Sequence, residues 1–119
     1  MSEKSDFGEE LAARHLTAQG YRVVERNWRA GKAGEIDVIA YDGPVLAFVE
    51  VKTRFGGAFG PPQSAVTGRK QAQMARVARS YLYRTGLYGT ADCRFDVVAV
   101  TVENGRTAIE LVKDAFRPR

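Results

Sequence analysis

The chain has 119 residues, 45% of them hydrophobic and 27% charged, with a formal net charge of +4. This length predicts one domain, residues 1–119, and the composition excludes collagen-like and low-complexity proteins. With Cys93 as the one cysteine and His15 as the one histidine, an intramolecular disulfide and a cysteine–histidine zinc site are excluded. The moderate basic excess is compatible with a polyanionic partner but does not establish one.

A reducing cytoplasm is the expected compartment for this chain. The first residues lack the apolar segment of a signal peptide. No stretch approaches the roughly 20 apolar residues needed to span a bilayer. No membrane association is therefore predicted.

A first helix is expected from a cap at Ser5 or Asp6 to about residue 19, with Gly20 ending it. Glu9 falls on the apolar face of this helix, whereas Glu10 points well away from it. The other members of that face are Ala12, Ala13 and Leu16. A carboxylate on an apolar stripe is notable, because an unpaired buried charge costs free energy.

Three strands follow the first helix. They are predicted at residues 21–28, 35–41 and 45–52. Asp42-Gly43 is a strong hairpin signal, so the second and third strands should pair directly. The third strand is apolar on both faces, as a central strand covered on both sides should be.

The second half of the chain begins with a glycine- and proline-rich loop at residues 55–62. Thr67 can cap a second helix to about residue 84, which has an apolar face and a basic face. Two strands are predicted at residues 94–102 and 107–112, joined by an Asn104-Gly105 turn. The order αβββαββ predicts an α/β fold with a central mixed sheet of about five strands flanked by helices.

The strongest functional signal lies on the predicted hairpin. Residues two apart in a strand share a face, so Glu35 lies beside Asp37, and Glu50 beside Lys52. The tight turn sets Asp37 roughly opposite Glu50, with their carboxylates close together. Two such carboxylates repel each other unless a cation neutralises them. The backbone carbonyl of Val51, between Glu50 and Lys52, would be a further ligand.

This arrangement suits Mg²⁺, which prefers oxygen ligands and often uses one or two carboxylates plus waters and phosphate. A bound metal would polarise a phosphodiester and activate water. Lys52 would orient or deprotonate that water, or stabilise charge developing on phosphorus. The alternative is structural, because a Glu-x-Lys pair on a strand is often only a surface salt bridge.

At this point the sequence resembles a known family. GEIDVIA at 34–40 and FVEVKTR at 48–54 resemble the PD-(D/E)xK restriction-endonuclease-like superfamily. More closely, the chain resembles the YraN-type bacterial family, which is itself similar to archaeal Holliday-junction resolvases. The similarity extends through GEELA at 8–12, GYRVVERNWR at 20–29, the FG-x-x-FG loop at 55–60 and RFDVV at 94–98.

The resemblance implies a restriction-endonuclease-like core and specific residue roles. Asp37 and Glu50 would be metal ligands, Lys52 the catalytic lysine, and Glu9 the helix-borne acid that completes the catalytic and metal site. Whether Glu9 or its neighbour Glu10 does so stays open. Glu35 would bind the metal or support its ligands. Ile36 departs from the family pattern, in which proline precedes the aspartate.

Several other residues are candidates for contact with a substrate. Residues expected to bind nucleic-acid phosphates are Arg29, Lys32, Arg54, Arg69, Lys70 and Arg76, although helices commonly carry such charges to solvent. Gln71 would support the site from the second helix, or would simply satisfy its own helix. Trp28 and Phe59 would stack on bases or serve as core and loop anchors. Asp96 is expected to form a structural ion pair.

The main hypothesis is a Mg²⁺- or Mn²⁺-dependent endonuclease that hydrolyses DNA phosphodiester bonds, on branched or junction DNA in repair or recombination. One alternative is a nucleic-acid-binding module that keeps the nuclease fold without turnover. Another is a protein-interaction subunit whose acidic cluster is structural. The resemblance to resolvases implies a homodimer, because a four-way junction has symmetry-related cuts.

Overall fold

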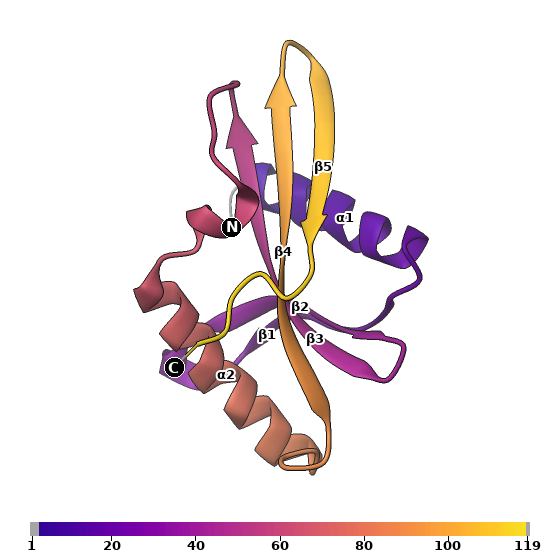
Figure 1. Cartoon of the computed structure of the whole chain (residues 1–119), viewed down its shortest axis with the longest axis vertical. Helices are drawn as coiled ribbons and strands as arrows, with labels where there is room; N and C mark the ends of the chain where they lie inside the picture. The colour runs from indigo at the N-terminus through magenta and orange to yellow at the C-terminus, as the bar shows by residue number, and fades with distance from the viewer. Residues whose placement is uncertain (1–2, 119) are drawn as a thin grey trace.

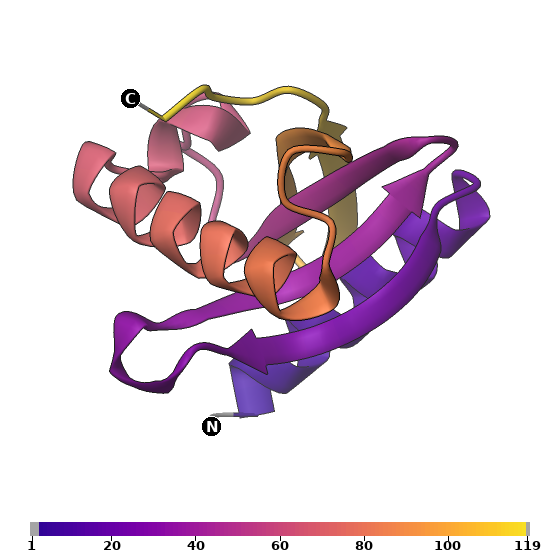
Figure 2. The ribbon, with the colours of Figure 1, turned by 90° about the horizontal axis from the view of Figure 1, so that it is seen from below.

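The computed structural model describes residues 3–118, with side chains from Asp6 onward, and it forms a sheet with a helix against each face (Figure 1, Figure 2). The helices are α1 (Glu3–Ala18) and α2 (Gly68–Thr85). The strands are β1 (Arg22–Arg29), β2 (Glu35–Asp42), β3 (Val45–Phe55), β4 (Asp92–Glu103) and β5 (Arg106–Val112). Two short 3-10 turns, η1 (Gly31–Ala33) and η2 (Pro62–Ala65), lie in the connections. The predicted order αβββαββ is confirmed.

The five strands lie in the sheet in chain order. β3 and β4 pair in parallel from Val45↔Asp92 to Phe55↔Val102, and the other neighbours are antiparallel. The predicted mixed sheet is therefore confirmed. This long parallel pairing carries β3 beyond its predicted end at residue 52, and it begins β4 two residues before its predicted start at 94.

The side chains of β3 alternate between two hydrophobic cores. Val49 packs with Leu16 of α1 on one face, and Phe48 packs with Tyr81 of α2 on the other. All these side chains except Tyr81, which is 7% exposed, are fully buried. Figure 2 shows the two helices on opposite sides of the sheet. Continued alternation directs Glu50 toward the α2 side.

The helix ends follow local chemistry. Gly20 has a φ of +96°, and Tyr21 donates its backbone N–H to Leu16 at 2.9 Å, which ends α1 as predicted. The predicted helix start is wrong, since α1 already includes Glu3. The proposed Ser5 cap concerns a side chain outside the described residues. At α2, the predicted Thr67 cap is confirmed, because its side chain accepts from the backbone N–H of Lys70.

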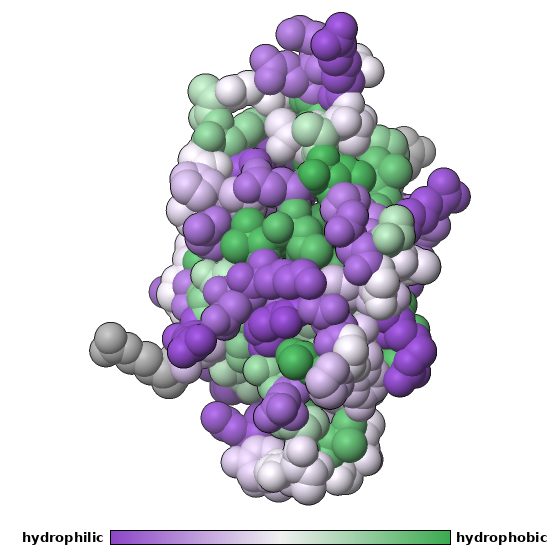
Figure 3. Space-filling view, turned by 45° about the vertical axis from the view of Figure 1, so that its right-hand side comes forward, coloured by the Kyte–Doolittle hydropathy of each residue, from purple (hydrophilic) through white to green (hydrophobic). Residues whose placement is uncertain are grey.

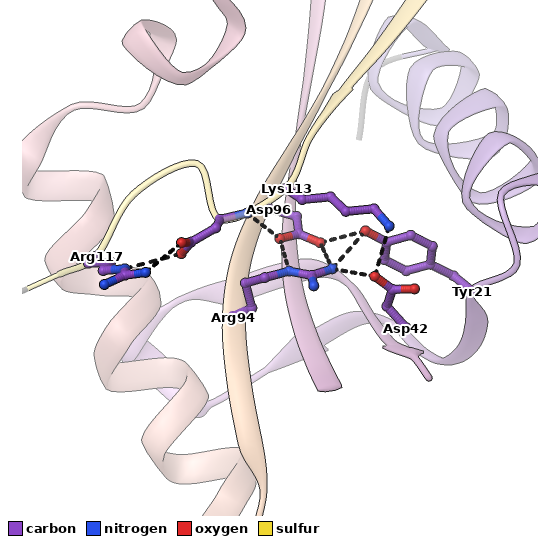
Figure 4. Close-up of polar contacts among 7 residues, drawn as sticks. Tyr21, Asp42, Arg94, Asp96, Lys113 and Arg117 are labelled. Atoms are coloured by element: carbon purple, nitrogen blue, oxygen red, sulfur yellow. Dashed lines mark hydrogen bonds and ion pairs between the residues drawn. The ribbon is translucent and has the colours of Figure 1, made fainter. Parts of the chain in front are cut away.

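A polar network joins β4 to the end of β2 and to the residues that flank β1 and β5 (Figure 4). Arg94 donates to both oxygens of the fully buried Asp96, at 2.8 and 2.9 Å, so the predicted Asp96 ion pair is confirmed. Tyr21 also donates to Asp96, at 2.7 Å, and Arg94 reaches Asp42 at 2.8 Å. The backbone N–H of Asp114 also donates to Asp96, at 3.0 Å. This bond attaches the segment after β5 to β4.

The surface is mixed in character. On the side shown in Figure 3, hydrophobic areas are separated by a band of hydrophilic residues, and the tip of the β4–β5 hairpin is hydrophilic. Within the described residues, neither helix has the length and apolar character required to cross a membrane.

Candidate active site

The candidate site begins where β2 and β3 separate. Their regular pairing runs from Asp42↔Val45 to Val38↔Val49, so the next residues along are Asp37 and Glu50. Here a side chain replaces the backbone pairing, because the Val51 N–H donates to Oδ2 of Asp37 at 2.8 Å. The predicted placement of Asp37 across from Glu50 therefore agrees with the register. Asp37 bridges the opening between the two strands.

The carboxylate of Glu50 is almost completely buried, with 4% of the residue exposed. Burial, followed by the charge of Asp37, raises the pKa of Glu50 to about 7, although Lys70 and Lys52 oppose the rise. Its Oε2 lies 3.5 Å from Nζ of Lys52 and 3.8 Å from Nζ of Lys70. Its Oε1 is buried without a hydrogen-bond partner among the described residues. One oxygen of Glu50 thus has two cations beside it, and the other has no donor.

Glu9 and Glu10, adjacent on α1, have opposite environments. Glu9 is 9% exposed, and its pKa is raised first by burial and then by the charge of Asp37. Glu10 is exposed, and hydrogen bonds from Arg26 and Arg14 lower its pKa. Glu10 lies 3.0 Å from Arg26 and 3.2 Å from Arg14. The charge of Asp37 therefore couples Glu9 to the cluster, whereas Glu10 belongs to a surface ion pair.

Lys70 and Asn27 are the residues whose connection to the cluster the sequence did not reveal. Lys70, expected to bind phosphate, lies instead beside Glu50. Asn27 interacts with the Glu9 side chain and lowers the pKa of that carboxyl against the effect of burial. A polar residue near the end of an otherwise regular strand was the only available signal for Asn27. No sequence signal gave the position of α2 that brings Lys70 to Glu50.

Glu35 and Gln71, the two residues predicted to support the site, differ in their relation to the acidic cluster. The charge of Glu35 raises the pKa of Glu9, and its Oε1 lies 3.9 Å from Arg29. Gln71 donates to the backbone carbonyl of Val66 at 3.1 Å. That bond ties α2 to the loop before it. Gln71 therefore has a local structural partner, which favours the alternative to a role in the site.

The predicted phosphate-binding residues lie at several places around the cluster. Arg54 donates to the backbone carbonyl of Gly60 at 3.0 Å and stacks on Phe59, with 4.7 Å to the ring centroid. Arg29, at the end of β1, and Lys32, within η1, are exposed. Arg69 and Arg76 are exposed on α2 and form no ion pair with other described residues.

The two aromatic residues considered for base stacking have internal contacts. The ring of Trp28 packs edge-on against Tyr81 at 5.1 Å, within the core under α2. Phe59 is exposed but covers Arg54. Both contacts favour the interpretation of these rings as core and loop anchors.

The donor set fits a hydrated divalent cation better than a closed metal cage. Within residues 3–118, no group of three or more histidine, cysteine, aspartate or glutamate side chains is arranged to hold a metal ion. Asp37 and Glu50 nevertheless offer two adjoining carboxylates, one with an unpaired buried oxygen. Because the Val51 N–H faces Asp37, its carbonyl faces the same opening. Mg²⁺ commonly uses one or two carboxylates and keeps several waters.

Comparison with known proteins gives the family. The chain matches "Uncharacterised protein family UPF0102" over residues 8–100. A UPF0102 protein of Symbiobacterium thermophilum is 52% identical, over 93% of this chain and 93% of the relative. Relatives from Moorella thermoacetica and Streptomyces coelicolor are 44% and 46% identical, over 95% and 87% of this chain and 94% and 81% of their own lengths. The expected YraN-type relationship is thereby confirmed, and the chain belongs to the UPF0102 family.

Proposed function

We propose that this protein is a divalent-metal-dependent endonuclease that hydrolyses DNA phosphodiester bonds. The observation that carries the proposal is the buried Glu50, which adjoins Asp37 with one oxygen unpaired and two lysines beside the other. A cluster of this kind combines ligands for a cation with positive charge for a phosphate. The sequence resemblance to the restriction-endonuclease-like superfamily implies a cluster of this kind. We therefore assign the fold to that superfamily.

Asp37, Glu50 and the Val51 carbonyl would hold Mg²⁺ or Mn²⁺, with Glu9 adding negative charge from α1. When bound, the metal supplies Lewis-acid polarisation of the phosphate and a more acidic water. Lys52, whose side chain is 37% exposed, can reach a phosphate from beside Glu50. Its ammonium would orient the attacking water and stabilise negative charge on the phosphoryl oxygens.

The outer face of α2 supports a polyanionic substrate. Arg69 and Arg76 are exposed there, seven residues apart and hence on the same side of the helix. Lys70, in the first turn of the same helix, has its Nζ 3.8 Å from Oε2 of Glu50. A nucleic-acid backbone held along this face would therefore lead to the acidic cluster. Branched DNA is the proposed substrate, with a homodimer for symmetry-related cuts and the cytoplasm as the compartment.

Cleavage assays test this function. Purified protein should cut branched, single-stranded or duplex DNA with Mg²⁺ or Mn²⁺, and EDTA should stop it. Asp37→Asn and Lys52→Ala should each reduce the rate by at least about 100-fold, because each removes a separate element of the chemistry. The exposed Glu110→Gln variant is the control. Equal cleavage by all four proteins would identify a contaminant and contradict the proposal.

A nucleic-acid-binding module without turnover is the second candidate. Lys52 and Lys70 favour it, because they already offset the charge of Glu50 without a metal. This function predicts salt-sensitive DNA binding that survives Asp37→Asn, with no cleavage under any metal. Metal-dependent cleavage by the wild-type protein that is lost in Asp37→Asn would eliminate it.

A further inference from the structure

Asn27 has an unusual backbone conformation for a strand residue. Its φ is +53°, in the left-handed region that asparagine enters more readily than most residues. Neighbouring residues of a regular strand point to opposite faces. Here Arg26 pairs with Glu10 of α1 at 3.0 Å, and Asn27 interacts with the neighbouring Glu9, whose pKa it lowers. The left-handed turn of the backbone therefore directs Asn27 toward the helix that carries Glu9.

The Asn27 side chain has a second feature, a buried oxygen without a partner. Among the described residues, the buried side-chain polar atoms that lack a hydrogen bond are Oδ1 of Asn27 and Oε1 of Glu50. An unpaired buried oxygen costs about 1–3 kcal/mol, so such atoms are rare and call for a donor. Here they come from two strands on either side of β2, which carries Asp37.

The register places both residues next to Asp37. Asn27 lies between the pairs Arg26↔Val38 and Trp28↔Ile36, which sets it opposite Asp37 on β2. Asp37 in turn adjoins Glu50 and the backbone of Val51 on β3. Asn27 and Glu50 thus flank Asp37 from the two neighbouring strands. A hydrated cation at Asp37 would bring water donors to both sides.

We propose that Asn27 is a positioning residue of the metal site, an inference that rests on the proposed function. Its amide N–H holds the Glu9 carboxylate toward Asp37, and its Oδ1 accepts a hydrogen bond from a water bound to the cation. Groups that orient metal ligands and waters in this way commonly change metal affinity by about 10–100-fold when removed. The alternative is a purely structural role, in which Asn27 only permits the backbone to turn.

The test separates the side chain of Asn27 from its backbone conformation. Asn27→Gly removes the amide but adopts a positive φ without strain. Asn104 offers a matched control, because it has a φ of +52° in the turn after β4. Isothermal calorimetry with Mn²⁺ alone should show at least about 10-fold weaker binding for Asn27→Gly and wild-type binding for Asn104→Gly. Both variants should still unfold in a single cooperative thermal transition, so a weaker Mn²⁺ affinity of Asn27→Gly is not a loss of the fold.

A double substitution tests whether Asn27 acts through Glu9. The loss of Mn²⁺ affinity caused by Asn27→Gly should be smaller in a Glu9→Gln background, since the residue that Asn27 holds is already altered. If Asn27→Gly binds Mn²⁺ with wild-type affinity, or if its effect is fully additive with that of Glu9→Gln, the positioning role of Asn27 is overturned. The proposed metal site would not be affected by that result. Absence of Mn²⁺ binding by the wild-type protein would overturn the proposed metal site as well.

Discussion

The buried carboxyl of Glu50 makes the free energy of unfolding depend on pH in a specific direction. Its pKa is raised from the ordinary value of 4.5 to about 7. Below pH 4.5 the group is protonated in both the folded and the unfolded state. As the pH rises through 7, the folded protein must ionise a buried group, so stability is lost between about pH 4.5 and 7. A shift of this size corresponds to about 3 kcal/mol.

Glu50→Gln removes this ionisation with little change in shape. Without metal, the variant should be about 3 kcal/mol more stable than the wild-type protein at pH 8.5 and equally stable at pH 4.5. Urea unfolding in EDTA at the two pH values, with unchanged m-values, measures the difference. Glu110→Gln, on the exposed side of β5, should give no pH-dependent gain. Parallel pH profiles for wild type and Glu50→Gln, or a less stable variant at pH 8.5, would show that Glu50 does not titrate as a buried acid.

The buried ion pair, the α2 surface and the metal site each have a measurable consequence. Arg94→Ala leaves the charge of buried Asp96 without its arginine and should cost about 3–5 kcal/mol in urea unfolding; a loss below 1 kcal/mol contradicts this. Arg69→Ala and Arg76→Ala should each weaken DNA binding and lower the salt dependence by about one ion, whereas Arg106→Ala on the β4–β5 hairpin should not; equal effects would refute a role for α2. Mn²⁺ affinity should rise as the pH increases through 7, because the glutamate ligand must lose its proton; a flat calorimetric profile from pH 6 to 8 would contradict this.

The sequence predicted the fold order and the centre of the site for local reasons. The Asp42-Gly43 turn fixes the register of β2 on β3, and strand alternation then assigns each side chain a face. These two constraints were enough to set Asp37 beside Glu50. Helical periodicity likewise separated Glu9 from Glu10, because only one of them falls on the buried face of α1.

Features that depend on long-range packing could not be predicted. Lys70 reaches Glu50 only because the loop after β3 returns α2 across the sheet. The parallel pairing of β3 with β4 joins strands far apart in the chain, and it extended both strands beyond their local signals. Asn27 was missed because alternation assumes a regular strand, and its left-handed φ breaks that assumption. Loop contacts also decide that Gln71 bonds Val66.

The central claim is that Asp37 and Glu50 together hold a divalent cation. A crystal of the protein soaked in Mn²⁺, measured at a wavelength where manganese scatters anomalously, tests it most directly. If the site holds a metal, an anomalous peak is expected about 2 Å from oxygens of both carboxylates and of the Val51 carbonyl. Soaked Asp37→Asn crystals should lose this peak. A wild-type map without a peak there, with Lys52 and Lys70 still beside Glu50, would contradict the claim.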